Sequence, residues 1–255
     1  MYAILMRHLL IAFLFISCNN FSKNNKLVAQ VYKVTTHDTV KNMPYNVTAK
    51  PEIFETAFFQ GTEVKSDTFL IKFYAINIGK IEVESGSLIA SEPWWVYDKH
   101  PFITKFPIGQ FPVQLSMAKV NQNEFVAFSR ILFSDRAVHH WEFALKQGQQ
   151  QIPIFGDSIY FYPVDGEIGG FMDDSSYNNF QALDTASQSQ VMEILTKELD
   201  KNQNLYANIN YKNINIVAFS SGLGDGGYAT YIGFDKDGNP CRLLTDFDLI
   251  DWRKN

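Results

Sequence analysis

Four aspartates stand in or beside glycine-rich turns, and their type and placement make them the first candidates for chemistry: Asp165, Asp173, Asp225 and Asp246. Glycine lets the backbone approach a ligand closely, and paired carboxylates can hold a water, a metal ion or a proton. The same turns also need Asp and Gly for their geometry alone. We therefore expect structural turns or, where two of these loops converge, a polar or metal-holding cleft.

A histidine pair, His139 and His140, precedes Trp141 and Glu142. It could supply an imidazole for acid–base work, because histidine titrates near neutral pH. Strand alternation would direct His139 and Trp141 to one face, and His140 and Glu142 to the other. No serine or cysteine nucleophile motif accompanies the pair, so histidines with structural partners in a strand are favoured.

The glycine-rich residues 222–227 match the G-x-G-x-x-G dinucleotide fingerprint, with Asp246 about 20 residues downstream. That fingerprint requires a helix to follow, so that the pyrophosphate meets the helix N-terminus. Residues 228–234 alternate in the manner of a strand instead. We therefore expect no nicotinamide or flavin, and no other cofactor.

A calcium loop is a second alternative, because Asp235, Asp237, Asn239 and Asp246 fall at ligand positions of an EF-hand-like loop. However, Pro240 occupies the position where glycine makes the sharp turn. An Asp-Gly pair between two apolar strands is a hairpin signal, since glycine accepts a positive φ. The pattern predicts a hairpin and no metal site.

The elements that would position these residues are mostly strands, marked by β-branched and aromatic residues between glycines and prolines. They are predicted at residues 28–34, 68–78, 80–90, 113–120, 125–133, 138–145, 157–164, 214–220, 228–234 and 241–247. Residues 125–132 are apolar on both alternating faces, which implies burial on both sides of the sheet. A helical turn or two is expected within residues 51–59.

One long helix is predicted over residues 185–201. Thr185 with Gln188 forms a capping box at its start. Its apolar residues fall on one face: Val191, Ile194, Leu195 and Leu199. Strands mixed with a late helix predict an α+β fold with a mainly antiparallel β-sheet, arranged as a single domain.

Composition and charge narrow the class of protein. Apolar residues make up 46% of the chain and charged residues 19%, as in a folded globular protein. The net charge of -5 argues against nucleic acid as a partner. With two cysteines, Cys18 and Cys241, neither a disulfide framework nor a thiolate zinc site is expected. We expect Cys241 in a buried strand; a disulfide to Cys18 is the alternative.

The N-terminus has the layout of a secretory signal: basic Arg7 and His8, then an apolar run too short to cross a bilayer. The sequence ending at Cys18, Leu-Phe-Ile-Ser-Cys, resembles a bacterial lipobox, which implies acylation (palmitate-type chains) of Cys18. This predicts a signal peptide at 1–17, a lipid-anchored polar tether at 18–50 and a globular domain at 51–255. The expected location is the cell envelope, membrane-anchored and facing the periplasm or exterior; an ordinary cleaved signal is the alternative.

Sequence blocks in the second half resemble the bacterial DUF4241 family of unknown function. The blocks that carry the resemblance lie at residues 112–116, 127–131, 141–145, 161–166, 171–173, 218–235 and 245–247. They occur in order and extend over residues 80–247. The resemblance implies family membership and one domain, and it adds no reaction.

Two functional hypotheses follow. The favoured one is a noncatalytic binding or accessory module, held on the membrane by its lipid and binding an envelope protein or glycan, with Trp94 and Trp95 as candidate aromatic anchors. The alternative is a hydrolase with or without a metal, whose candidate catalytic residues are Asp165, Asp173, Asp225, His139 and His140.

Overall fold

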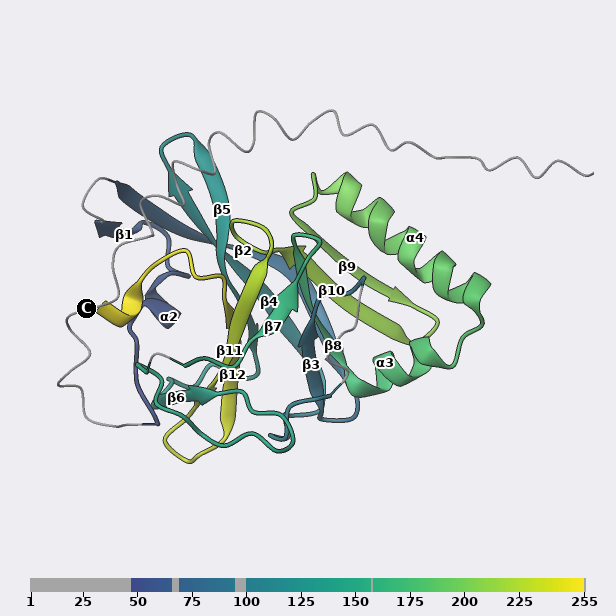
Figure 1. Cartoon of the computed structure of the whole chain (residues 1–255), viewed down its shortest axis with the longest axis horizontal. Helices are drawn as coiled ribbons and strands as arrows, with labels where there is room; N and C mark the ends of the chain where they lie inside the picture. Colours follow the sequence, from purple (N-terminus) through teal and green to yellow (C-terminus); the bar gives the residue numbers. More distant parts are fainter. Residues whose placement is uncertain (1–46, 66–68, 95–99, 157, 255) are drawn as a thin grey trace, which may run out of the picture. The chain divides into compact units, whose positions relative to one another are not determined.

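The computed structural model describes residues 47–65, 69–94, 100–156 and 158–254. Cys18, Trp95, the signal peptide, the strand expected at 28–34 and nearly all of the tether lie outside the described residues. The described residues form one α+β domain of mainly antiparallel strands, as predicted (Figure 1).

The strands form two sheets. The larger sheet contains β1 (Thr62–Lys65), β2 (Leu70–Val83), β4 (Gly109–Val120), β5 (Asn123–Leu132), β6 (His140–Phe143), β7 (Tyr162–Val164), β11 (Gly226–Phe234) and β12 (Pro240–Asp246). Its order is β1-β2-β4-β5-β12-β11-β6, with β7 pairing β11. The smaller sheet, in the order β3-β8-β10-β9, contains β3 (Leu88–Ser91), β8 (Ile168–Asp173), β9 (Tyr206–Tyr211) and β10 (Ile214–Ser220). Each of these pairings is antiparallel.

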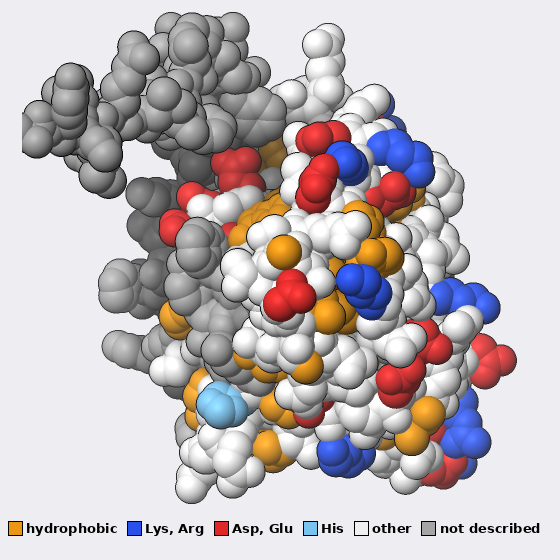
Figure 2. Space-filling model, turned by 90° about the vertical axis from the view of Figure 1, so that its right-hand side faces the viewer, with side chains coloured by type: hydrophobic (Ala, Val, Ile, Leu, Met, Phe, Trp, Pro, Cys, Tyr) orange, Lys and Arg blue, Asp and Glu red, His pale blue; other side chains and the backbone are white. Residues whose placement is uncertain are grey.

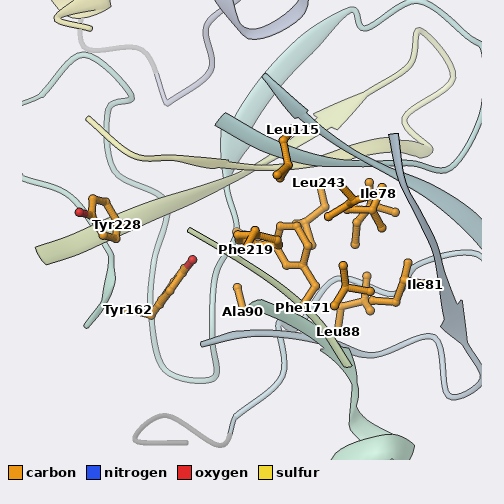
Figure 3. Packing of buried hydrophobic residues seen from close by; sticks show 14 of the residues in the cluster. Ile78, Ile81, Leu88, Ala90, Leu115, Tyr162, Phe171, Phe219, Tyr228 and Leu243 are labelled. Carbon is orange, nitrogen blue, oxygen red and sulfur yellow. The ribbon is translucent and has the colours of Figure 1, made fainter. Parts of the chain in front are cut away.

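One hydrophobic core fills the space between the two sheets. Phe171 of β8 and Phe219 of β10 pack edge to face, with ring centroids 5.0 Å apart. Around them lie side chains of the larger sheet, including Ile81, Leu115 and Leu243 (Figure 3). Both phenylalanines are fully buried, and burying such a ring stabilises the fold by about 1.5–3 kcal/mol.

Helices cover the outer face of the smaller sheet. They are α3 (Asp174–Gln181), which packs on β10, and α4 (Thr185–Lys201), which packs on β9. Of the predicted stripe of α4, Val191, Leu195 and Leu199 are buried and Ile194 is partly buried. Figure 2 shows acidic and basic side chains interspersed on this side of the molecule, where Lys197 pairs with Glu193 one helical turn away. Among the described residues, no helix is long and apolar enough to span a membrane.

The cap of α4 differs from the prediction. Asp184, one residue before the expected capping box, is the N-cap, and its carboxylate accepts the backbone N–H of Ser187 at 2.8 Å. The Gln188 amide donates instead to the carbonyl of Phe180 at 3.2 Å. The capping box of Thr185 and Gln188 was therefore wrong, because an aspartate one position earlier satisfies the same free N–H groups.

Two strand boundaries also differ. Gly79 does not end a strand: β2 runs through it, with an irregularity between Asn77 and Lys80 in the pairing with β4. Gly79 has φ +106, a conformation open to glycine, and its N–H is bound by the Asn77 side chain at 3.0 Å. The strand expected at 157–164 is reduced to β7, Tyr162–Val164, which pairs only with the first residues of β11.

An aromatic cluster packs on the other face of the larger sheet. Phe54, from the short helix α2 (Ile53–Thr56), is fully buried. Its ring centroid lies 5.8 Å from Phe128, 5.1 Å from Trp141, 5.0 Å from Tyr231 and 4.8 Å from Trp252. Because Phe128 belongs to β5, this packing confirms the predicted burial of both faces of that strand.

We expect Phe54→Ala to lower the free energy of unfolding by about 3–5 kcal/mol, because it leaves a cavity among four aromatic rings. Phe59→Ala is the matched control: Phe59 follows the same helix but is 58% exposed, so its loss should cost less than about 0.5 kcal/mol. Urea unfolding measures both. Equal effects of the two substitutions would contradict the packing described here.

Asp246, at the end of β12, anchors the C-terminal segment and is 3% exposed. Its carboxylate accepts the indole N–H of Trp252 at 2.6 Å and the backbone N–H of Asp248 at 2.9 Å. Burial raises the pKa of Asp246 to about 6, against the opposing effects of Arg253 and the Trp252 hydrogen bond. Asp246, one of the four candidate aspartates, therefore holds the C-terminal segment in place.

The raised pKa of Asp246 predicts a specific pH dependence. The folded state retains the Asp246 proton up to about pH 6, whereas the unfolded chain loses it near pH 3.8, so ionisation of Asp246 lowers stability as the pH rises between these values. We expect the wild type to lose up to about 3 kcal/mol of unfolding free energy relative to Asp246→Asn between pH 4 and pH 7. Asp200→Asn, on the exposed surface of α4, is the control for the loss of a surface carboxylate. A constant or growing difference for Asp246→Asn would refute the assignment.

Candidate functional site

Two of the candidate aspartates, Asp165 and Asp225, meet at one corner of the fold. The pairing of β7 with β11 sets Val164 opposite Gly226, so the turn after β7 lies beside the loop before β11. The backbone N–H of Glu167, in that turn, donates to Asp225 Oδ1 at 3.2 Å. The loops that carry Asp165 and Asp225 therefore lie side by side.

Glu92 is a buried carboxylate that contacts the turn at Asp165. It follows β3, is 1% exposed, and accepts the backbone N–H of Asp165 on Oε2 at 2.7 Å. Its other oxygen, Oε1, is buried and has no hydrogen-bond partner among the described residues. We call Glu92, Asp165, Glu167 and Asp225 the acid corner; all but Glu92 are exposed.

Gly166 brings the turn close to the buried carboxylate. A Cβ atom at Gly166 would lie 2.6 Å from Glu92 Oε1 and 3.2 Å from Trp94 Cδ1. The next residue, Glu167, has a left-handed φ of 58. A glycine is needed here because any side chain would displace Glu92 or Trp94.

The electrostatics of the acid corner are unfavourable for a buried charge. Burial raises the pKa of the Glu92 carboxyl, and the negative charges of Asp165 and Asp225 add to this rise. The backbone N–H groups of Asp165 and Gly166 oppose it. Within the described part of the chain, no three acidic, histidine or cysteine side chains are placed to hold a metal ion together.

Asp173 lies away from the acid corner. It ends β8, a six-residue strand that separates it from the turn at Glu167 by roughly 17 Å. It is fully buried as the N-cap of α3, and its carboxylate accepts the N–H groups of Ser175 at 2.9 Å and Ser85 at 3.2 Å. Asp173 therefore stabilises a helix start and a neighbouring turn.

The histidine pair is also remote from the acid corner. His140 pairs with Phe234, at the end of the nine-residue strand β11 opposite to Gly226, a separation of roughly 27 Å. Its ring stacks on Phe234 and lies 3.3 Å from the Glu142 carboxylate. His139 is exposed beside His140, with 3.2 Å between their Nδ1 atoms, whereas Trp141 is buried. The prediction that His139 shares the face of Trp141 was wrong, because the strand begins only at His140.

A pocket lies at the start of β7. Its cavity volume is about 20 Å³, and we call it the tyrosine pocket. Its lining residues are Phe102, Ala144, Lys146, Gln149, Tyr160, Phe161, Tyr162, Tyr228 and Thr230. Tyr228 connects it to the acid corner: its hydroxyl donates to the carbonyl of Gly224 at 2.6 Å, and burial raises its pKa to about 12. Figure 3 shows Tyr162 and Tyr228 together at one end of the inter-sheet core.

Exposed apolar side chains stand around this pocket. Phe161 lines it and is 57% exposed, Ile159 two residues earlier is 37% exposed, and Ile103, next to pocket-lining Phe102, is 51% exposed. A volume of about 20 Å³ holds about one water molecule, so the exposed side chains at the rim, and not the cavity itself, offer a contact surface. Trp94 is half-buried and packs partly against the α4 core.

The other motifs have structural roles. Strand β11 begins within the G-x-G-x-x-G sequence, so no helix follows it, as predicted. Asp235 accepts the N–H groups of Asp237 and Asn239, each at 2.9 Å, in the predicted hairpin between β11 and β12. Cys241 is a free, buried cysteine of β12, as expected.

Sequence reasoning missed Glu92 and the tyrosine pocket. Glu92 directly follows an apolar strand and precedes a proline, and an acid at such a position was the available signal. The pocket joins Phe102, Lys146, Tyr160 and Tyr228 from separate segments, so no local spacing could indicate it.

Comparison with known proteins identifies a family and no activity. A family model described as a protein of unknown function (DUF4241) matches residues 81–245, well over half of the chain. Neither a curated protein nor a solved structure matches. The matched segment contains every residue of the acid corner and of the tyrosine pocket. The chain therefore belongs to the DUF4241 family, as its sequence blocks predicted.

Proposed function

We propose that this protein is a lipid-anchored protein of the cell envelope whose globular domain is a noncatalytic binding module for an envelope protein or glycan. The observation that carries the binding role is the exposed ring of Phe161 at the tyrosine pocket, one residue before β7, the strand that leads to the acid corner. Aromatic side chains that combine exposure with a fixed position are the usual anchors of binding surfaces.

The position of Phe161 is fixed by a glycine. A Cβ atom at Gly227 would lie 2.5 Å from the Phe161 ring, so the ring rests directly on the β11 backbone. Gly227 itself is held opposite Pro163 by the pairing of β7 and β11. A ligand contacting Phe161 would thus meet a ring with little freedom to lose, which favours binding.

The envelope location rests on the N-terminal sequence. The resemblance to a lipobox assigns acylation to Cys18, and the polar residues that follow would separate the domain from the membrane surface. Acyl chains bind a membrane through their buried methylene groups, at about 0.8 kcal/mol each.

We expect Cys18→Ala to move the protein from the membrane fraction to the soluble fraction, because it removes the acylation site. Fractionation with immunoblotting, and mass spectrometry of the mature N-terminus, measure this. Cys241→Ala is the control and should remain with the membrane, since Cys241 is buried in a strand. Unchanged fractionation of Cys18→Ala would refute the anchor.

We expect Phe161→Ala to reduce a crosslinked partner by about fivefold or more in pull-downs from envelope extracts, because truncating an aromatic anchor costs more than about 1 kcal/mol. Phe59→Ala is the matched control, as the two rings are 57% and 58% exposed but lie on different elements. Equal capture by wild type and Phe161→Ala would exclude this ring as an anchor.

A hydrolase is the second candidate, and the convergence of Asp165 and Asp225 supports it. Since Asp173, His139 and His140 lie elsewhere, such an enzyme would use these two carboxylates with Glu92. Turnover of an envelope peptide or glycan that is abolished by both Asp165→Asn and Asp225→Asn would favour this candidate over the binding module.

A further inference from the structure

The acid corner gathers negative charge without balancing it. Its four carboxylates come from three segments: the end of β3, the turn between β7 and β8, and the loop before β11. None of the four forms an ion pair with a lysine, arginine or histidine among the described residues. Like charges held at one place repel each other, and an external cation relieves that repulsion.

Glu92 adds an independent indication of a ligand. Its side chain is buried, with 1% exposure, and its Oε1 atom accepts no hydrogen bond from the described residues. A buried carboxylate with an unused oxygen is costly, and such groups occur where a ligand supplies the missing donor.

The Gly166 turn and Trp94 pack closely around Oε1. A Cβ atom at Gly166 would lie 2.6 Å from Glu92 Oε1 and 3.2 Å from Trp94 Cδ1. Charge-assisted N–H···O hydrogen bonds span about 2.7–2.9 Å, so a cation that bonds to Oε1 must bring a nitrogen this close. Because Oε1 is closed to water, the half-buried Trp94 ring must shift to admit that nitrogen.

The arrangement suits an organic cation better than a metal ion. The carboxylates are spread over three segments, and no three ligating side chains of the described residues are placed around a single ion. A guanidinium has five N–H donors in a planar fork, and an ammonium has three, so each can reach several spread carboxylates. Both cations are also attracted to the face of a tryptophan ring.

We propose that the acid corner binds the guanidinium or ammonium group of a basic side chain on a protein partner. Glu92 accepts a hydrogen bond from below, and Asp165, Glu167 and Asp225 surround the charge at the surface. This assignment rests on the proposed binding function and specifies the partner as a protein with an exposed arginine or lysine.

The test uses an acetylated and amidated tri-arginine peptide with the full-length protein in non-ionic detergent. Titration is followed by tryptophan fluorescence, because Trp94 must move, and by calorimetry. We expect saturable binding that weakens with salt and falls about tenfold or more in Glu92→Gln, since removing one partner of a buried charge pair costs at least this much. Asp225→Asn should lower the affinity about two- to fivefold, because Asp225 is exposed. A tri-glutamate peptide should not bind.

Asp200→Asn on α4 is the matched control, because it changes the net charge by the same amount away from the acid corner. Equal loss in this variant, or unchanged binding by Glu92→Gln and Asp225→Asn, would overturn the proposal. So would millimolar calcium chloride displacing the peptide at constant ionic strength, since a metal ion would then occupy the corner. Thermal melting shows whether Glu92→Gln folds. If that variant does not fold, Asp225→Asn still tests the site, because Asp225 is exposed.

The outcome is separable from the proposed function as a whole. Loss of tri-arginine binding with Phe161-dependent capture intact would overturn only the cation site. Tri-arginine binding without Phe161-dependent capture would retain the cation site and overturn the role of the tyrosine pocket.

Discussion

The pairing of β11 with its neighbours is the constraint on which both the fold and the candidate site depend. This strand pairs with β12 along one edge, and with β6 and then β7 along the other. Its first residues, Gly226 and Gly227, have no side chains, so Phe161 and Tyr228 pack directly against the backbone there. The short pairing of β7 with β11 thereby places the tyrosine pocket and the charged turn at the two ends of β7.

The acid corner and the tyrosine pocket have opposite physical character. The pocket is lined mostly by aromatic rings, with one lysine as its charged residue, whereas the corner is a group of carboxylates beside backbone N–H groups. Tyr228 belongs to the pocket but is bonded to the carbonyl of Gly224 in the loop of the corner. A partner that covered both regions would make apolar and ionic contacts over a small area, which is typical of a specific interface.

The elements of this fold follow from local sequence more closely than its site does. Alternation predicted the strands around β4, β5 and β12, and helical spacing predicted α4 with its buried stripe. The errors arose where two local signals competed: an aspartate displaced the capping box, and a bulge carried β2 through Gly79. Family membership was also predictable, because its motifs are contiguous.

The site was only partly predictable. Glycine-rich turns indicated Asp165 and Asp225, but the same signal also selected Asp173 and Asp246, which are buried and structural. Local sequence cannot separate these cases, since tertiary pairing decides which turns meet. Glu92 was missed because its significance depends on contacts with residues more than 70 positions away in the chain.

The folding unit extends beyond the segment by which the family is recognised. The matched residues begin inside β2 and stop one residue before Asp246, so they exclude both Phe54 and Trp252, two rings that complete the packing on one face of the larger sheet. A fragment cut at the family boundaries would expose that face to solvent. Such an apolar sheet surface is prone to self-association, so studies of related chains should retain the segments on both flanks.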